Sequence, residues 1–455
     1  MPNSTPKKKP AVSLQTRVRE LESQNRQLRR KNEELSTRLS SKRYKAMDFV
    51  VDSFYKVARH KKASAGKAKT HIDDEPIVVE NRKFTPKKVD ILNMNFYDWD
   101  GKTVFKGGAE RYVHDLAKLL QSMGYKVRLL QQSNEPFEKT FDGIKVVGVG
   151  GGVADFEQLS ASYNDISQDC EFVIASPLEL ACNITSVPVI GINHGSILDH
   201  IENRYSFSAG PKRYDHIMKA LNNVEDCVCV DTNFINWTRT HDYELALKAT
   251  YIPNYYDKNQ FKYSAKSEKK KGDKLVFVYP RRLYSARGYD ITIEAFRHVF
   301  EKHQNKAILN FVGQVDNDDV EADLKSFMED YPKNVFHYEY PAEEMDKAYK
   351  DADVVLVPTR YSEGTSLSCI EAMALGKAII ATNIGGLPNL VIDNYNGRLI
   401  SPTADDLEAA VLEMIEQPKQ REKLANNAHL VAEAAFEKKL WEERWTEVIR
   451  KIAQE

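Results

Sequence analysis

Short apolar runs alternate with amphipathic segments from Lys87 onward, and this alternation constrains the fold more than any other feature of the chain. The runs KVDILNMNF, KVRLLQQ, CEFVIASP, VPVIGINHG and DCVCVDT are typical of buried strands. Between the first two lies GGAERYVHDLAKLLQSMG, which is typical of a helix that ends at a glycine. Strands that alternate with helices pair in parallel. The pattern therefore predicts a doubly wound α/β domain, Rossmann-like in form, over residues 87–256.

A second series of the same kind follows ATYIPNYYD. The strand-like runs KLVFVYP, AILNFVG, NVFHYEY, ADVVLVP and AIIATN alternate with helical segments such as DITIEAFRHVFEKH. This series predicts a second Rossmann-like domain over residues 257–440. We expect residues 441–455 to form a helix that packs back across the domains. Two domains also fit a chain of 455 residues, which exceeds what one hydrophobic core usually supports.

The balance of charges limits the partners of the chain. Lys and Arg number 65 and Asp and Glu number 66, a net charge of −1, which argues against nucleic acid. No apolar run approaches the roughly 20 residues of a spanning helix, and MPNSTPKKKP lacks the apolar segment of a secretory signal. The five cysteines form no CxxC pair and no zinc-type spacing. We therefore expect a cytoplasmic protein with reduced cysteines.

The N-terminal segment has a heptad pattern. We expect residues 1–12 to be a disordered basic tail and residues 13–41 to form a coiled coil. The apolar and Asn residues recur in alternating steps of four and three at Leu14, Val18, Leu21, Asn25, Leu28, Asn32, Leu35 and Leu39. Both asparagines fall at a positions, where a buried Asn pairs well only with another in register. The pattern predicts a parallel homodimer through residues 14–39; the alternative is a solvated charged helix.

Residues 42–86 read as a basic amphipathic helix followed by a linker. The apolar stripe consists of Met47, Val50, Val51, Phe54, Val57 and Ala58. Lysines and arginines crowd its flanks between residues 42 and 62. Such a helix either binds an anionic membrane surface, here the inner face of the cell membrane, or packs on the domains that follow. The small, polar stretch ASAGKAKTHIDDEP is typical of a linker.

The stretch RYSEGTSLSCIEAMALGKAIIATNIGGLPNLV places Glu363 and Glu371 around a predicted helix start. Glu363 follows the strand-like DVVLVP, and ligands of open α/β sheets bind beyond the carboxyl ends of strands. The turn EGTS offers free backbone N–H groups to a phosphate or a sugar hydroxyl. Because the two carboxylates lie eight residues apart, about two helical turns, both can face one cleft. The stretch therefore predicts a site for a polyol with a phosphate beside it, namely a nucleotide sugar.

Three arginines follow the first strand of the second domain. Arg281, Arg282 and Arg287 lie in YPRRLYSARGYD, where cations would meet a diphosphate and arginine can bind it bidentately. The alternative for each is an ordinary surface arginine.

The segments PRRLYSARG and SEGTSLSCIEAMALGKAIIATNIGGLPNLVIDNYNGRLISP resemble the retaining nucleotide-sugar glycosyltransferases of family 4. These enzymes have the GT-B fold of two facing Rossmann domains, and the resemblance covers roughly Val89 to the C-terminus. In the second domain the E-x7-E spacing, Gly385-Gly386 and Pro388 match. In the first, GGAERYVHDLAKLL and NHGS look like the Gly-Gly loop and the active-site histidine of the family.

The resemblance implies a role for each matching residue. Arg282 and Arg287 would hold the diphosphate, Glu363 the donor sugar and Glu371 the ribose. His194 would approach the transferred sugar. The implied catalytic residues are His194, Glu363, Arg282 and Arg287, and the implied donor-binding residues are Gly107, Gly108, Arg282, Arg287, Glu363, Gly364, Thr365, Ser366 and Glu371.

The second domain would thus bind the donor, the first would face the acceptor, and Gly107-Gly108 would let the facing loop close on the donor. The chain departs from the family pattern at three positions. Arg287 stands where the family often has Lys, Arg281 replaces a common glycine, and Thr365 stands where an aromatic residue is frequent.

The sequence predicts no essential metal and no cofactor besides the nucleotide-sugar substrate. DWD at residues 98–100 matches the DxD metal motif of a different glycosyltransferase fold, but two Asp at this spacing are expected about once by chance in such a chain. GVGGGV at residues 148–153 is not GxGxxG, because position 153 is Val.

The resemblance implies a retaining hexosyltransferase that acts on a glycan or lipid-linked glycan acceptor in the synthesis of a bacterial surface polysaccharide. One alternative is a nucleotide-sugar epimerase or a glycan phosphorylase on the same fold. Another is a catalytically silent scaffold that uses the coiled coil and the basic helix to organise a polysaccharide assembly complex. A scaffold would have no need for the charges at Arg282, Arg287, Glu363 and Glu371.

Overall fold

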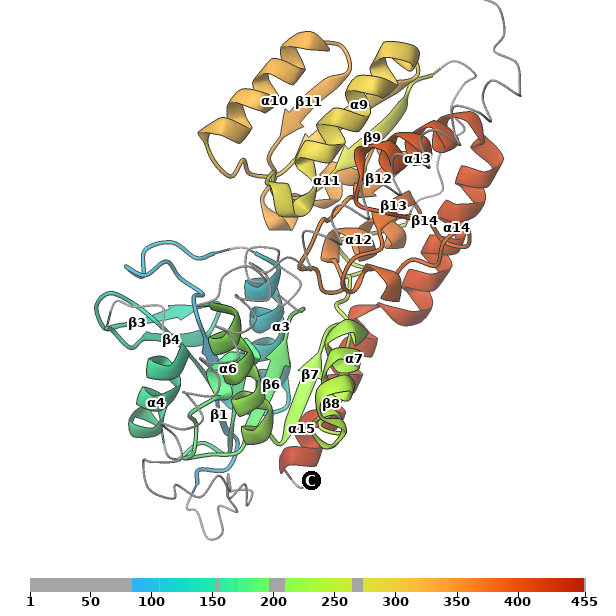
Figure 1. Ribbon diagram of the computed structural model, residues 1–455. Coiled ribbons are helices and arrows are strands. Elements are labelled where there is room, and N and C mark those ends of the chain that lie inside the picture. Colours follow the sequence, from blue (N-terminus) through green and yellow to red (C-terminus); the bar gives the residue numbers. More distant parts are fainter. Residues whose placement is uncertain are drawn as a thin grey trace, which may run out of the picture. The chain divides into compact units, whose positions relative to one another are not determined.

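The computed structural model describes residues 84–105, 107–151, 156–167, 169–195, 209–263 and 273–453. The predicted basic tail, coiled coil and basic amphipathic helix lie outside the described residues. Two α/β domains make up the described part, each built on a mainly parallel sheet with helices against it (Figure 1). The alternation of strand-like and helical segments in the sequence predicts both domains.

The first domain contains an eight-stranded sheet in the order β3-β4-β2-β1-β5-β6-β7-β8. Its strands are β1 (Lys88–Asn93), β2 (Lys126–Gln131), β3 (Phe137–Phe141), β4 (Ile144–Gly148), β5 (Phe172–Ser176), β6 (Val189–Asn193), β7 (Asp226–Cys229) and β8 (Ala249–Tyr251). Its helical segments are α3 (Gly108–Ser122), α4 (Phe156–Ile166), η1 (Leu178–Ala181), α6 (Ala209–Asn223), α7 (Thr232–His241) and α8 (Tyr243–Ala246). All neighbours pair in parallel except β3 and β4. The antiparallel edge hairpin is a feature that the sequence analysis did not predict.

The second domain contains a six-stranded parallel sheet in the order β11-β10-β9-β12-β13-β14. Its strands are β9 (Leu275–Tyr279), β10 (Ala307–Val312), β11 (Val335–Tyr338), β12 (Val354–Val357), β13 (Ala378–Thr382) and β14 (Arg398–Ile400). Its helical segments are η2 (Ser285–Arg287), α9 (Tyr289–His303), α10 (Asp318–Asp330), η3 (Ala342–Glu344), α11 (Asp346–Tyr349), α12 (Leu367–Ala374), η4 (Leu387–Asn389), α13 (Ala404–Glu416) and α14 (Pro418–Ala435). The strand order reverses between β9 and β12, and this switch point is where doubly wound folds bind ligands.

Helix starts in both domains carry the polar side chains that cap free backbone N–H groups. Asp231 accepts a hydrogen bond from the N–H of Phe234 at the start of α7, and Asn317 accepts one from Val320 at the start of α10. Thr403 does the same for Asp406 at α13. Such caps each stabilise a helix by about 1 kcal/mol, so these boundaries are encoded locally.

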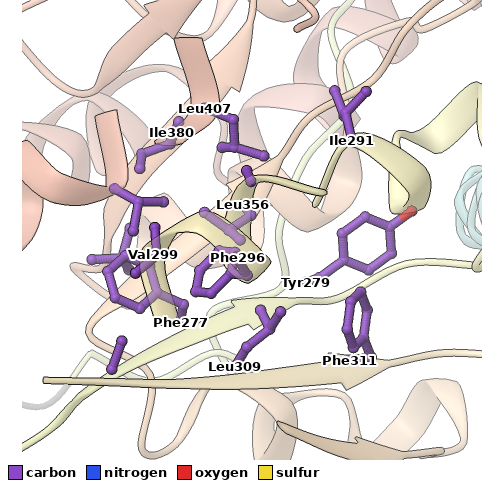
Figure 2. Packing of buried hydrophobic residues seen from close by; sticks show 14 of the residues in the cluster. Phe277, Tyr279, Ile291, Phe296, Val299, Leu309, Phe311, Leu356, Ile380 and Leu407 are labelled. Carbon is purple, nitrogen blue, oxygen red and sulfur yellow. The ribbon is translucent and has the colours of Figure 1, made fainter. Parts of the chain in front are cut away.

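Figure 2 shows the core on one face of the second sheet. Phe277 and Tyr279 of β9 and Leu309 of β10 pack against Phe296 and Val299 of α9. Because α9 covers this face of β9, the core holds the end of β9, from which the next loop begins.

The C-terminal helix α15 (Lys438–Ala453) packs against the first domain, although it follows the second in the chain. Trp441, Trp445, Val448 and Ile449 are buried in the same cluster as Val228 of β7. Figure 1 shows α15 in red beside the green strands of the first sheet. The chain therefore crosses from the second domain back to the first through α15.

Candidate active site

The candidate site lies at the carboxyl ends of β9 and β12. Residues 280–288 follow β9, and residues 358–366 connect β12 to α12. Glu363, Gly364, Thr365 and Ser366 lie in the second of these loops, and Glu371 lies within α12. The structure thus places Glu363 and the three arginines on neighbouring loops at the switch point of the sheet, and Glu371 in the helix that follows.

Glu363 is buried and surrounded by hydrogen-bond donors. Its Oε2 atom accepts hydrogen bonds from Nη2 of Arg281 at 2.7 Å and from Oγ1 of Thr359 at 2.8 Å. Nη1 of Arg287 lies 3.3 Å from the same oxygen. Burial raises the pKa of Glu363, but the charges of Arg281 and Arg287 outweigh burial, and the pKa is lowered from its ordinary value. Glu363 is therefore an ionised acceptor at neutral pH.

The three arginines of this region have different surroundings. The Arg281 side chain is 8% exposed and pairs with Glu363. Arg282 is exposed, and the charge of its guanidinium acts on Glu110 of the first domain. Arg287 donates from Nη1 to the carbonyl of Ser362 at 2.7 Å. Arg282 is thus exposed to an anion, Arg287 is partly engaged by Ser362 and Glu363, and Arg281 is committed to the protein.

The Gly385-Gly386 pair packs against the backbone of Glu363. Gly385 has φ of 54°, and a Cβ atom there would lie 2.1 Å from the carbonyl oxygen of Glu363. The N–H of Gly386 donates to that same carbonyl at 2.9 Å. Any side chain at position 385 would displace the loop that carries Glu363, which explains this glycine fourteen residues after Glu371.

The first domain contacts the same loop through Gly195. A Cβ atom on Gly195, which has φ of 126°, would lie 2.7 Å from the backbone nitrogen of Gly364. Thr365 also faces the first domain, since its Oγ1 donates to the carbonyl of Val230 at 2.8 Å and accepts from the N–H of Asn254 at 2.9 Å. Ser366 lies directly before α12, and its hydroxyl is 3.1 Å from that of Ser368. The Thr365 side chain therefore joins the domains, and its backbone carbonyl accepts a further hydrogen bond from Nδ2 of Asn254 at 2.5 Å.

Glu371 is buried between the two domains. Its Oε1 accepts a hydrogen bond from Nη2 of Arg111 on α3 at 2.9 Å, and its Oε2 accepts one from the hydroxyl of Tyr349 at 2.8 Å. Burial, together with the charge of Glu371, raises the pKa of Tyr349 well above its ordinary value, so this hydroxyl remains a donor. Arg111 was not among the residues predicted from the sequence.

His194 follows β6 at the carboxyl edge of the first sheet. Its Nε2 lies 2.9 Å from the hydroxyl of Ser176, which ends β5, and its ring contacts that of Tyr112 edge-on at 5.1 Å between centroids. Burial lowers the pKa of His194 to about 4. The imidazole is therefore neutral at pH 7 and can donate or accept a hydrogen bond without adding charge.

Gly107 and Gly108 lie at the start of α3. Gly107 is the residue before the helix, and a Cβ atom on Gly108 would lie 3.1 Å from the Leu367 side chain at the start of α12. The Glu110 carboxylate folds back and accepts a hydrogen bond from the backbone of Gly107. Burial raises the pKa of Glu110, against the opposing effects of this hydrogen bond and of the Arg282 charge. The starts of α3 and α12 thus lie on the two sides of one site.

The carboxylates of DWD hold a turn of their own loop. Asp98 accepts hydrogen bonds from the N–H groups of Lys102 and Thr103, and Asp100 pairs with the Lys102 side chain at 3.0 Å. Over the described ranges, one group has the residue types and spacing of a metal site, namely His298, Asp405 and Glu408. Glu408 already pairs there with His298 and Lys302, and the group lies between α9 and α13.

Sequence reasoning found the carboxylates but missed two of their partners. The sequence marks Arg281 only as a cation and as a departure from a common glycine, whereas in the structure Arg281 pairs with Glu363. Arg111 lies 260 residues from Glu371 in the chain. The available signal was its place on α3 one turn beyond Gly107-Gly108, whose loop is expected to close on the donor.

Residues 260–431 match the family described as glycosyl transferases group 1. The second domain is a group 1 glycosyltransferase domain. The match includes the arginines after β9, both glutamates and the Gly-Gly pair, so the prediction of a glycosyltransferase domain of the GT-B type is confirmed here.

Two relatives are similar to this chain. The uncharacterized glycosyltransferase MJ1178 of Methanocaldococcus jannaschii is 26% identical over 379 residues, which are 77% of this chain and 95% of that protein. The lipopolysaccharide 1,2-N-acetylglucosaminetransferase of Salmonella typhimurium is 26% identical over 183 residues, which are 37% of this chain and 46% of that protein.

A solved structure of Anabaena Alr3699/HepE in complex with UDP-glucose matches with a TM-score of 0.62 and 18% identity, over 80% of this chain and 99% of that chain. This likeness confirms the two-domain α/β fold of the GT-B type. No helix among the described residues of the chain combines the length and apolar character needed to span a membrane.

Proposed function

We propose that this glycosyltransferase transfers a hexose from a nucleoside-diphosphate sugar to a glycan or lipid-linked glycan, with retention of anomeric configuration. The observation that carries the proposal is the buried, ionised Glu363 between arginines at the switch point of the second sheet. A carboxylate accepts strong hydrogen bonds from sugar hydroxyls, and arginines beside it can bind a diphosphate. The complexes of Anabaena Alr3699/HepE with UDP and UDP-glucose make UDP-glucose the first donor to test.

Each predicted residue then has a role. Arg282 and Arg287 stabilise the charge that develops on the leaving diphosphate, the contribution most needed as the glycosidic bond breaks. Glu363 accepts hydrogen bonds from the hydroxyl groups of the donor sugar, and Glu371 accepts hydrogen bonds from those of the ribose. His194, neutral at pH 7, approaches the transferred sugar as a hydrogen-bond partner. The acceptor attacks on the face that the diphosphate leaves, and the leaving phosphate takes its proton.

The synthesis of a surface polysaccharide is the proposed setting, and the similarity to the Salmonella lipopolysaccharide enzyme supports it. In this setting the protein is cytoplasmic, residues 14–39 form a parallel homodimer, and residues 42–62 bind an anionic membrane surface. The heptad pattern and the basic flanks of the apolar stripe support these two assignments.

A nucleotide-sugar screen tests the proposal. Thermal shift with UDP-, GDP-, ADP- and dTDP-sugars should reveal a donor that raises the melting temperature, because a ligand that binds only the folded state stabilises it. The donor is then incubated with the protein alone. We expect the sugar to remain unchanged until an acceptor glycan is added. Conversion to another nucleotide sugar without acceptor would establish an epimerase instead.

A further inference from the structure

Arg281 connects Glu363 to the end of β12. Its Nη2 donates to Oε2 of Glu363 at 2.7 Å, and its Nη1 donates to Oγ1 of Thr359. The Thr359 hydroxyl donates in turn to the same Oε2 at 2.8 Å. The side chains of Arg281 and Glu363 are 8% and 9% exposed, and Thr359 is fully buried. The three groups therefore form a closed, buried triangle of hydrogen bonds.

This triangle makes the two oxygens of Glu363 unequal. Oε2 accepts from Arg281 and Thr359, with Arg287 a further 3.3 Å contact. Oε1 accepts no hydrogen bond from the described part of the chain. Each carboxylate oxygen offers about two lone-pair positions, so those of Oε2 are used by the protein. Oε1 is the oxygen that a ligand can use.

We propose that Arg281 is a positioning residue which, with Thr359, holds one oxygen of Glu363 and leaves the other for the donor sugar. The inference rests on the proposed function, since it supposes that Glu363 binds that sugar. Its role differs from that of Arg282 and Arg287, which face the diphosphate. The glycine common at this position in the resembling family could not make these contacts.

The charges around Glu363 support this division of roles. Burial raises its pKa, and the charges of Arg281 and Arg287 lower it. Two further titratable residues of the described chain lie near Glu363: Cys369 on α12, whose pKa burial raises to about 12, and His194, whose backbone carbonyl contacts the Gly364 backbone. Both are uncharged at neutral pH. Arg281 and Arg287 are therefore the cations that keep Glu363 ionised.

The first test is Arg281→Lys, with paired ligands. Lysine keeps the charge, but its ammonium cannot reproduce the planar fork that bonds Glu363 and Thr359 together. Calorimetry is done with UDP and UDP-glucose, or with GDP and GDP-mannose, ADP and ADP-glucose, or dTDP and dTDP-glucose, whichever pair the wild type binds. We expect the affinity for the nucleotide sugar to fall about tenfold, the loss of one charged hydrogen bond, and that for the nucleoside diphosphate to stay within about twofold.

Two further variants and one control separate positioning from folding. Thr359→Val removes one donor to Oε2 and should weaken nucleotide-sugar binding selectively even if Arg281→Lys folds poorly. Arg281→Gln removes the charge, so the pKa of Glu363 rises. The loss of nucleotide-sugar affinity that accompanies protonation of Glu363 at acidic pH, the acidic limb of binding, should then move to higher pH. The matched control is Arg297→Lys, since Arg297 on α9 pairs with Asp330 at 2.6 Å on an exposed surface. The control should bind both ligands like the wild type.

The outcomes are distinct. A wild type that binds none of the ligand pairs refutes the proposed function and, with it, this inference. A wild type that binds normally while Arg281→Lys weakens both ligands equally would assign Arg281 to the diphosphate and overturn the inference. Unchanged binding of both ligands, or an acidic limb unmoved in Arg281→Gln, would also overturn it.

Discussion

Glu363 and Glu371 are both buried, and each is held by an arginine from another segment of the chain. The arginine of Glu363 comes from the loop after β9, and that of Glu371 comes from α3 in the first domain. A buried ion pair costs desolvation energy and is weak evidence for stability. We interpret both pairs as devices that keep the carboxylates oriented until a ligand arrives.

His194 supplies a prediction for pH dependence. Burial lowers its pKa from about 6.5 to about 4, so the folded protein binds the proton less readily than the unfolded chain. The contribution of the neutral imidazole to stability is fully present at a pH above the pKa of the unfolded chain, about 6.5. It is lost as the pH falls from about 6.5 to about 4. The wild type should therefore lose about 2 kcal/mol more than His194→Gln in free energy of unfolding between pH 7 and pH 5.

Urea unfolding of both proteins at the two pH values measures this difference. Equal losses in the wild type and in His194→Gln would mean that the imidazole is accessible to water and protonates in the folded state.

At the scale of elements, α15 completes the first domain. Nε1 of Trp445 donates to the hydroxyl of Tyr112 at 2.7 Å, and the Tyr112 ring contacts both Trp441 and His194 at 5.1 Å between centroids. The last helix therefore packs behind the tyrosine that supports the candidate active-site histidine.

Trp445→Ala should destabilise the first domain by about 3–5 kcal/mol, because it removes a fully buried indole and leaves a cavity. The matched control is Lys439→Ala on the same helix, where Lys439 and Glu443 form an exposed pair at 3.8 Å. Its effect should stay within about 0.5 kcal/mol. Denaturant unfolding followed by circular dichroism distinguishes the two. A loss in Trp445→Ala as small as that of the control would mean that α15 is not part of this core.

The strands could be predicted where the sequence is continuously apolar. LVFVY of β9 and VVLV of β12 are buried on both faces, so their runs stand out from the sequence. FEKTF of β3 is an edge strand with a mostly exposed middle, and its composition gives little signal. The carboxylates could be predicted because one motif contains both. Arg111 could not, because its contact with Glu371 depends on how two domains meet.

At the scale of the whole molecule, the N-terminal segment is predicted to control association and not chemistry. A chain that begins near Thr70 retains both α/β domains. It should be monomeric by light scattering, lose salt-sensitive binding to anionic vesicles, and still transfer sugar to a short soluble acceptor. A truncated chain that remains dimeric would place the contact in the α/β domains. If the full-length protein does not bind the vesicles at low salt, the stripe from Met47 to Ala58 packs against protein instead of binding a membrane.

The turnover of Arg282→Ala tests the central claim most directly. Arg282 is exposed, so its removal should change the free energy of unfolding by no more than about 0.5 kcal/mol. Release of nucleoside diphosphate from the donor chosen by the screen is measured with and without an acceptor glycan. We predict acceptor-dependent release by the wild type and release about 100-fold slower in Arg282→Ala, because the leaving diphosphate loses a cation. Equal turnover in the two proteins, or release by the wild type that needs no acceptor, would contradict the account.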